Sequence, residues 1–167
     1  MLATTPTLKQ LPGYSGKQPF DPLGVSNFVD VRLLREAELK HGRIAMLASV
    51  GFVAPDVGLR LPGVTLSSLQ AHDALVSSPY GGSMGQILLF VGLLEVFVGL
   101  PAVMYMLGGG TRAPGDFNFD PLGLSGPNAE AAELANGRLA MLSFGAIVTQ
   151  AALGFPAFPY ASLPWSK

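Results

Sequence analysis

The chain has 167 residues, of which 49% are hydrophobic and 13% are charged, and its mean hydropathy is +0.42. This composition is too apolar for an ordinary soluble domain and fits a small membrane protein with several spans. The formal net charge of -1 gives no basic surface for nucleic acid, and the absence of cysteine excludes disulfides, thiolate metal sites and thiol catalysis.

Three apolar segments predict an all-α fold of three membrane-spanning helices. The middle segment, residues 84–107, has Glu95 as its only charge and exceeds the roughly 20 residues that a helix needs to cross the hydrocarbon core. The first and third segments, residues 29–54 and 129–153, have shorter apolar cores, and charged motifs at their heads lower their hydropathy.

Connections rich in Gly, Pro, Asp and Ser separate these segments, at residues 55–82 and 108–127. Pro101 predicts a kink near the end of the middle helix. Residues 1–13 have neither the apolar core of a secretory signal nor an arginine-rich amphipathic pattern, so we expect that any import segment has been removed. We expect one domain over residues 1–167, without a separate soluble domain.

An internal repeat relates the first and third helices. The sequence Glu-Leu-Lys-His-Gly-Arg-Ile-Ala-Met-Leu from Glu38 matches Glu-Leu-Ala-Asn-Gly-Arg-Leu-Ala-Met-Leu from Glu133, and Phe-Asp-Pro-Leu-Gly precedes both copies, from Phe20 and Phe119. Because one span separates the copies, both helices cross in the same direction. The repeat therefore predicts a pseudo-twofold axis along the membrane normal.

Small residues lie below the acid of each copy on one helix face, which lets two backbones approach. They are Gly42, Ala45 and Ser49 in the first helix and Gly137 and Ala140 in the third. Across the axis, Arg138 can reach Glu38 and Arg43 can reach Glu133, so we predict two reciprocal ion pairs between the helices.

His41, Asn136 and Gln150 lie on faces displaced from this crossing strip. On a purely structural interpretation, the ion pairs only hold the two helices together in the membrane, and these three residues are hydrogen-bonded at helix contacts. All three are also neutral metal donors. A cofactor that already carries its metal and needs one axial ligand would use them, and magnesium accepts oxygen and imidazole donors.

The two motifs resemble those of the light-harvesting chlorophyll-binding protein family, the three-helix antenna proteins of plastid thylakoids. The sequence from Glu38 to Ala48 is most similar to that of the fucoxanthin chlorophyll a/c and red-lineage branch, and the resemblance spans roughly residues 20–150. The resemblance implies that axial ligands to chlorophyll magnesium lie at Glu38, His41, Glu133, Asn136 and Gln150, with Arg43 and Arg138 as partners of the glutamates.

In the middle helix the resemblance implies further ligands at Gln86 and Glu95. Glu95 has the stronger case because an unpaired carboxylate in the membrane needs a partner. Gln86 lies near a helix end and is equally explained as a solvated residue. His72, expected in a loop after the first span, is either a further ligand or a solvated histidine.

The two Asp-Pro-Leu-Gly segments predict rigid turns before the first and third helices. Turn chemistry alone explains them, and the resemblance adds binding of the end groups of two carotenoids. The residues concerned are Asp21, Pro22, Leu23, Asp120, Pro121 and Leu122. The expected pigments are chlorophyll a, chlorophyll c and carotenoids of the fucoxanthin or another xanthophyll type. The tail after residue 153 has no histidine, so the ligand that plant members place there is expected to be missing.

The function implied is a light-harvesting antenna that catalyses no reaction, with other antenna subunits, a photosystem I or II core and thylakoid lipids as partners. A photoprotective quencher shares the motif. A small transporter would need a polar face along a span, and only isolated polar groups occur. The bias of positive charge predicts a stromal N-terminus, and Trp165 is expected to anchor at the interface. The cations compared are Lys9, Lys17, Arg32, Arg35 and Arg112 against Arg60 and Lys167.

Overall fold

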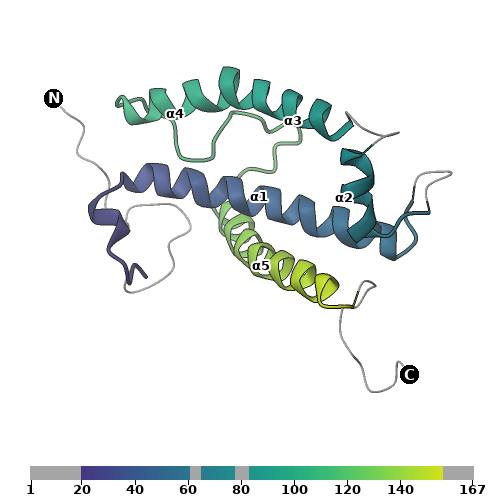
Figure 1. Cartoon of the computed structure of the whole chain (residues 1–167). Helices are drawn as coiled ribbons and strands as arrows, with labels where there is room; N and C mark the ends of the chain where they lie inside the picture. Colours follow the sequence, from purple (N-terminus) through teal and green to yellow (C-terminus); the bar gives the residue numbers. More distant parts are fainter. Residues whose placement is uncertain (1–19, 61–64, 78–82, 156–167) are drawn as a thin grey trace. The chain divides into compact units, whose positions relative to one another are not determined.

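A computed structural model describes residues 20–60, 65–77 and 83–155 (Figure 1). Within these ranges the ordered elements are helices, and no strand occurs in them, as the all-α prediction requires. The chain divides into two compact units. Unit 1 holds the described residues up to Arg43 together with Leu93–Arg138, and unit 2 holds Ile44–Gly92 together with the described residues from Leu139 onward.

Two long helices carry the repeat, α1 (Val31–Asp56) and α5 (Pro127–Ala152). Two residues after the end of each helix lies a glycine in the left-handed region, Gly58 with φ +99° and Gly154 with φ +106°. Such a glycine closes the last turn, and the amide of Leu59 donates to the Ala54 carbonyl at 2.9 Å. The bounds differ by about two residues from the predicted spans, and α1 includes Pro55, which we expected in the connection.

The middle helix is continuous from Ser83 to Leu107 and is the one helix in the described part of the chain that is both long and apolar enough to cross a membrane. It consists of α3 (Ser83–Leu94), a π-helical stretch η3 (Glu95–Gly99) and α4 (Leu100–Leu107). In η3 the Leu100 amide donates to the Glu95 carbonyl, five residues back. The polar residues of the repeat lower the hydropathy of α1 and α5.

A short helix, α2 (Ser68–Val76), interrupts the segment 55–82, where the sequence predicted only a connection. Ser67 and Gln70 form a capping box at its start, because the Ser67 hydroxyl accepts from the Gln70 amide and the Gln70 side chain accepts from the Ser67 amide. The Ser68 hydroxyl donates to Asp56 at 2.7 Å, so α2 begins against the end of α1 within unit 2. His72 therefore lies on an exposed helix and not in a loop, which corrects the prediction.

Among the described residues, few apolar side chains are buried by the protein itself. The buried apolar residues are Val31, Met106 and Leu134 in unit 1 and Ala45 and Ala151 in unit 2. Only 6% of the most apolar window of the middle helix is buried. Contiguous exposed apolar surface of this kind requires a cover of lipid, partner protein or bound apolar molecules. The predictions made for Lys9, Lys17, Trp165 and Lys167 concern residues outside the described ranges.

Candidate functional site

The two copies of the repeat meet at a pair of glycines in unit 1. A Cβ atom added to Gly42 would lie 3.0 Å from the Cα atom of Gly137, and one added to Gly137 would lie 3.0 Å from the Cα atom of Gly42. Both residues are buried. The backbones of α1 and α5 therefore touch at this point, which confirms the helix contact predicted from the small residues.

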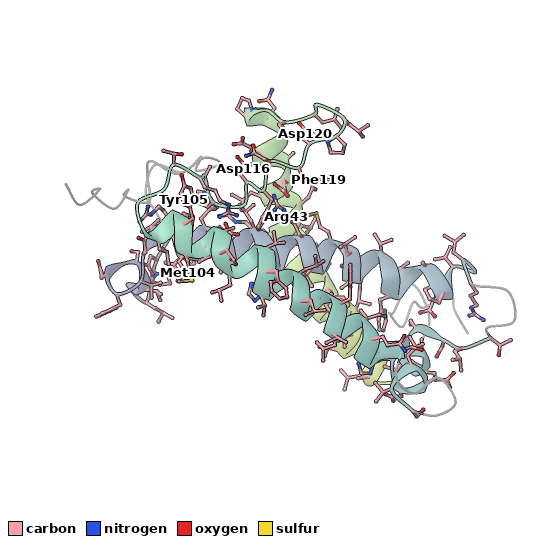
Figure 2. The ribbon with its side chains drawn as sticks, turned by 90° about the horizontal axis from the view of Figure 1, so that it is seen from above. Arg43, Met104, Tyr105, Asp116, Phe119 and Asp120 are labelled. Atoms are coloured by element: carbon pink, nitrogen blue, oxygen red, sulfur yellow. The ribbon has the colours of Figure 1, made fainter. Side chains whose placement is uncertain are left out.

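Both predicted ion pairs are present beside these glycines. Arg43 donates to Glu133 through Nε at 2.5 Å and Nη2 at 3.1 Å (Figure 2 shows Arg43). Arg138 donates to Glu38 through Nε at 2.7 Å. A second cation that the sequence analysis did not assign, Arg35, binds the other oxygen of Glu38 at 2.6 Å. Each carboxylate thus faces at least one guanidinium, which offsets its charge.

A third carboxylate, in the helix that is apolar enough to cross a membrane, also has a partner. Lys40 of α1 donates to Glu95 of η3 at 2.5 Å. The description of Glu95 as an unpaired carboxylate is therefore wrong, because a lysine from another helix neutralises it. Gly99 makes room for this contact, since a Cβ atom at Gly99 would collide with the Glu95 carboxylate.

A fourth carboxylate, Glu36, binds the connection that leads from the middle helix to α5. Its side chain is 2% exposed. It accepts two hydrogen bonds from Arg112, at 2.9 and 3.1 Å, and one from the Gly115 amide at 2.6 Å. Arg43 donates to the Gly115 carbonyl at 2.9 Å, so the loop contacts two residues of α1. The sequence analysis missed this cluster, and its 76-residue separation leaves no local signal.

The His41 ring is held by a contact within its own helix. Its Nδ1 atom lies 2.7 Å from the Ala37 carbonyl oxygen, one helical turn earlier. Because that carbonyl can only accept, the hydrogen bond places the proton of a neutral ring on Nδ1 and leaves the lone pair on Nε2. The ring is exposed, so Nε2 is accessible to a ligand outside the protein.

The amide ligands predicted at Asn136, Gln150 and Gln86 are all exposed. Within the described residues none of their side chains makes a hydrogen bond to protein, so their oxygen atoms remain accessible. The Nε atom of Arg35 is buried and also lacks a partner there. No group of three or more acidic or histidine side chains in the described part of the chain is placed to hold a metal ion. These donors stand singly, so they fit a cofactor that brings its own metal and takes one axial ligand.

The two Asp-Pro-Leu-Gly segments form the same turn. Asp21 accepts hydrogen bonds from the amides of Val25 and Ser26, and Asp120 accepts from those of Leu124 and Ser125, at 2.9 to 3.0 Å. Gly24 and Gly123 have φ values of +63° and +65°. The repeat therefore extends to the backbone of its approach loops.

These bonds stabilise the charged form of both aspartates. Hydrogen bonds from the Ser125 side chain and from the Ser125 and Leu124 amides lower the pKa of Asp120 to about 2. The pKa of Asp21 is lowered as well, first by the Ser26 side chain. The apolar residues of both turns point outward: Phe20, Leu23, Phe119 and Leu122 are exposed, as are Pro22 and Pro121 (Figure 2 shows Phe119 and Asp120).

Residues 5–152 match the family model described as chlorophyll A-B binding protein. Fucoxanthin-chlorophyll a-c binding proteins F and D of Phaeodactylum tricornutum are 34% and 33% identical to the chain, with 86% of this chain and 81% of each relative covered. Light-harvesting complex stress-related protein 3.2 of Chlamydomonas reinhardtii is 36% identical, with 85% of this chain and 62% of that relative covered. The chain therefore belongs to the chlorophyll a-b binding protein family, as the resemblance of its repeat predicted.

Proposed function

We propose that the protein is a light-harvesting antenna that binds chlorophylls and carotenoids and passes excitation energy towards a photosystem. The observation that carries this proposal is the helix contact at Gly42 and Gly137, with charge-neutralised glutamates beside it and the accessible donors His41 and Asn136 close by. Family membership supports it. Bound pigments supply light absorption and energy transfer, while the protein fixes their positions. The proposal assigns no catalytic step to the chain.

The chain's own groups would hold magnesium in two ways. His41, Asn136, Gln150 and Gln86 offer neutral nitrogen or oxygen donors. Glu133 and Glu95 each offer a carboxylate beside one cation of another helix, so that the ligand and its partner are together neutral, whereas Glu38 faces the two guanidiniums of Arg138 and Arg35. Neutrality matters because an unbalanced charge in the hydrocarbon region costs several kcal/mol.

The carotenoid part of the proposal rests on the two Asp-Pro-Leu-Gly turns. Each presents exposed apolar side chains beside a rigid backbone, Leu23 in one turn and Leu122 in the other. Such a surface suits the end ring of a long apolar pigment. The fucoxanthin-chlorophyll a-c binding relatives favour chlorophyll a, chlorophyll c and a fucoxanthin-type xanthophyll as the pigments.

We place the protein in the plastid thylakoid as one domain with three spans. The chloroplastic relatives favour the plastid, and the helix Ser83–Leu107 favours a membrane. On this proposal α1 and α5 also span and are related by a pseudo-twofold axis, the N-terminus is stromal, and His72 is solvated or holds a peripheral chlorophyll. Other antenna subunits, a photosystem I or II core and thylakoid lipids are the proposed partners.

A photoprotective role is the second candidate, because stress-related light-harvesting proteins are 36% identical to the chain. An antenna keeps the excited state of chlorophyll long enough for transfer, whereas a quencher shortens it. The fluorescence lifetime of the isolated pigment–protein complex therefore separates the two functions. A long lifetime with efficient excitation through carotenoids supports the antenna, and a strongly shortened one supports the quencher.

Reconstitution of the chain with a thylakoid pigment extract tests the proposal directly. The wild-type protein is expected to retain several chlorophylls and carotenoids per chain, and His41→Ala and Asn136→Ala are each expected to lose about one chlorophyll. Asn128→Ala, which changes an exposed amide in the first turn of α5, is the matched control. Pigment counts that stay equal in all four proteins would contradict the assigned ligands, and failure to retain any pigment would contradict the function.

A further inference from the structure

A cavity of about 470 Å³ lies in unit 1 between the end of the middle helix and the loop that follows it. Val98, Ala102 and Tyr105 line its helix side, and their spacing of four and three residues places them on one face. Its loop side is lined by Thr111, Arg112, Asp116, Phe117 and Asn118, and the Arg112 guanidinium lies over the Phe117 ring at 4.4 Å from its centre. Figure 2 shows Tyr105 on α4 and Asp116 on the loop.

On the helix side, the lining changes from the phenol of Tyr105 to the apolar side chains of Ala102 and Val98. Val98 precedes Leu107, the end of the candidate span, by nine residues, which corresponds to roughly 13 Å of helix. Val98 and Ala102 therefore lie at hydrocarbon depth, whereas Tyr105 and the loop lie at the interface. A molecule that fills this cavity has a polar head at the loop and an apolar part along α4.

The charges of the cavity disfavour an anionic head. The guanidinium of Arg112 is already bound by Glu36, and its Nε atom donates to the Asp116 carbonyl at 2.6 Å. The Asp116 carboxylate is exposed and accepts one hydrogen bond, from the Asn118 amide at 2.8 Å. A phosphate or sulfate beside this carboxylate would be repelled.

The remaining polar groups suit a ligand with many hydroxyls. In the described part of the chain, the side chains of Tyr105, Thr111 and Asn118 make no hydrogen bond. Together with Asp116 they offer both donors and acceptors, as neighbouring hydroxyls require. The Tyr105 ring packs against Gly110, where a Cβ atom would collide with it, so the ring is held at the edge of the cavity. The Tyr105 ring, with its hydroxyl at the interface, suits a lipid headgroup that has one apolar face and one polar edge.

From this arrangement we propose that the cavity binds the sugar headgroup of a neutral glycolipid, with an acyl chain along Val98 and Ala102. The site adjoins one proposed chlorophyll ligand, because Glu95 lies three residues before Val98 and its partner Lys40 lies 6.0 Å from the centre of the Phe117 ring. The proposal therefore rests on the proposed function, which pigment retention tests separately. A hydroxylated carotenoid end group shares part of this chemistry, and the experiment below distinguishes the two sources.

The test uses the full pigment–protein complex, delipidated in detergent and titrated with digalactosyldiacylglycerol, phosphatidylglycerol or phosphatidylcholine of matched acyl chains. Native mass spectrometry counts the bound lipids. One digalactosyldiacylglycerol per chain is expected, with phosphatidylglycerol at least fivefold weaker. Tyr105→Phe and Asn118→Gly each remove a hydrogen-bonding group, and each is expected to weaken galactolipid binding roughly fivefold. Glycine preserves the positive φ of Asn118.

Asp116→Asn separates recognition from a structural role, because it keeps the shape and the turn but removes the charge. It is expected to narrow the preference for galactolipid over phosphatidylglycerol, whereas Asp73→Asn, an exposed carboxylate on α2, is expected to leave the preference unchanged. Equal affinity of the wild type for both lipids, or unchanged affinities in the variants, would overturn the proposal. Loss of one carotenoid from the variants, with lipid binding intact, would assign the cavity to a pigment instead.

Discussion

Arg43 binds Glu133 through two hydrogen bonds, whereas Arg138 reaches Glu38 through one. The two pairs are reciprocal in sequence but not equivalent in geometry. Arg43 also donates to the Gly115 carbonyl, and its side chain is 37% exposed against 54% for Arg138. Glu38 also accepts a hydrogen bond from Arg35, which adds to its weaker pair with Arg138.

This asymmetry predicts unequal costs of removing the two arginines. Arg43→Gln is expected to lower the free energy of unfolding by about 2 kcal/mol, because a bidentate charged contact and a backbone contact are lost. Arg138→Gln is expected to lower it by less than about 1 kcal/mol, because an exposed single contact contributes little. Denaturant unfolding of the reconstituted complex, followed by circular dichroism, measures both. Equal losses would show that the pairs are equivalent once pigments are bound.

The glycine contact gives a second prediction with its own control on the same helix. Gly42→Ala is expected to destabilise the protein by about 1 to 3 kcal/mol, because its new Cβ atom meets the backbone of Gly137 and the helices have to shift. Gly51→Ala places a Cβ atom in open space on α1 and is expected to be neutral or stabilising by up to about 1 kcal/mol through helix propensity. Thermal unfolding of the two variants separates the effects. A loss at Gly51 equal to that at Gly42 would point to the helix itself and not to the crossing.

The contact between Lys40 and Glu95 predicts a charge rescue. Lys40→Gln leaves the Glu95 carboxylate without its cation and is expected to reduce the pigment held by the middle helix. The double variant Lys40→Gln with Glu95→Gln removes both charges, while the amide keeps an oxygen donor, so it is expected to recover part of the pigment. Pigment-to-protein ratios after reconstitution measure both. A double variant no better than Lys40→Gln would show that neutrality at this position is not what matters.

The two aspartate turns predict resistance to mild acid. A carboxyl group with a lowered pKa contributes stability that is complete above its ordinary value of 3.8 and is lost as the pH falls through the folded value, which is about 2 for Asp120. At pH 3 the Asp120 carboxylate is therefore expected to remain mostly ionised. Carbon NMR of aspartate-labelled protein measures this, and Ser125→Ala is expected to raise the pKa because it removes the largest cause. An Asp120 that is mostly protonated at pH 3 in the wild type would contradict the turn geometry.

The sequence predicted the parts of the site that the repeat encodes. The helix contact, both arginine–glutamate pairs and the long apolar helix follow from spacing and composition, because each depends on residues within one helix or on its copy. The residues of the first copy without a charged equivalent could not be placed in this way. Glu36 and Lys40 correspond to Ala131 and Ala135 in the second copy, and both bind distant segments, so no periodicity marks their partners.

Helix α2 was missed for a different reason. Its signal, Ser67 followed three residues later by Gln70, was present in the sequence. The Gly and Pro on either side masked it, so the whole segment was interpreted as a connection. The π-helical stretch η3 was also not predicted, and the contact of the Glu95 carboxylate with Gly99 inside it becomes visible only in the structure.

The scarcity of protein contacts along Ser83–Leu107 has a consequence for how much of the protein a cell accumulates. Because only 6% of the most apolar window of this helix is buried, contacts with the rest of the chain stabilise the helix little. Whatever binds only the native form therefore raises stability in proportion to the logarithm of its free concentration. Chains that are synthesised faster than the molecules that bind them would stay without ligand and would be exposed to proteases. The amount of the protein in the cell would therefore depend more on the synthesis of its ligands than on the amount of its messenger RNA.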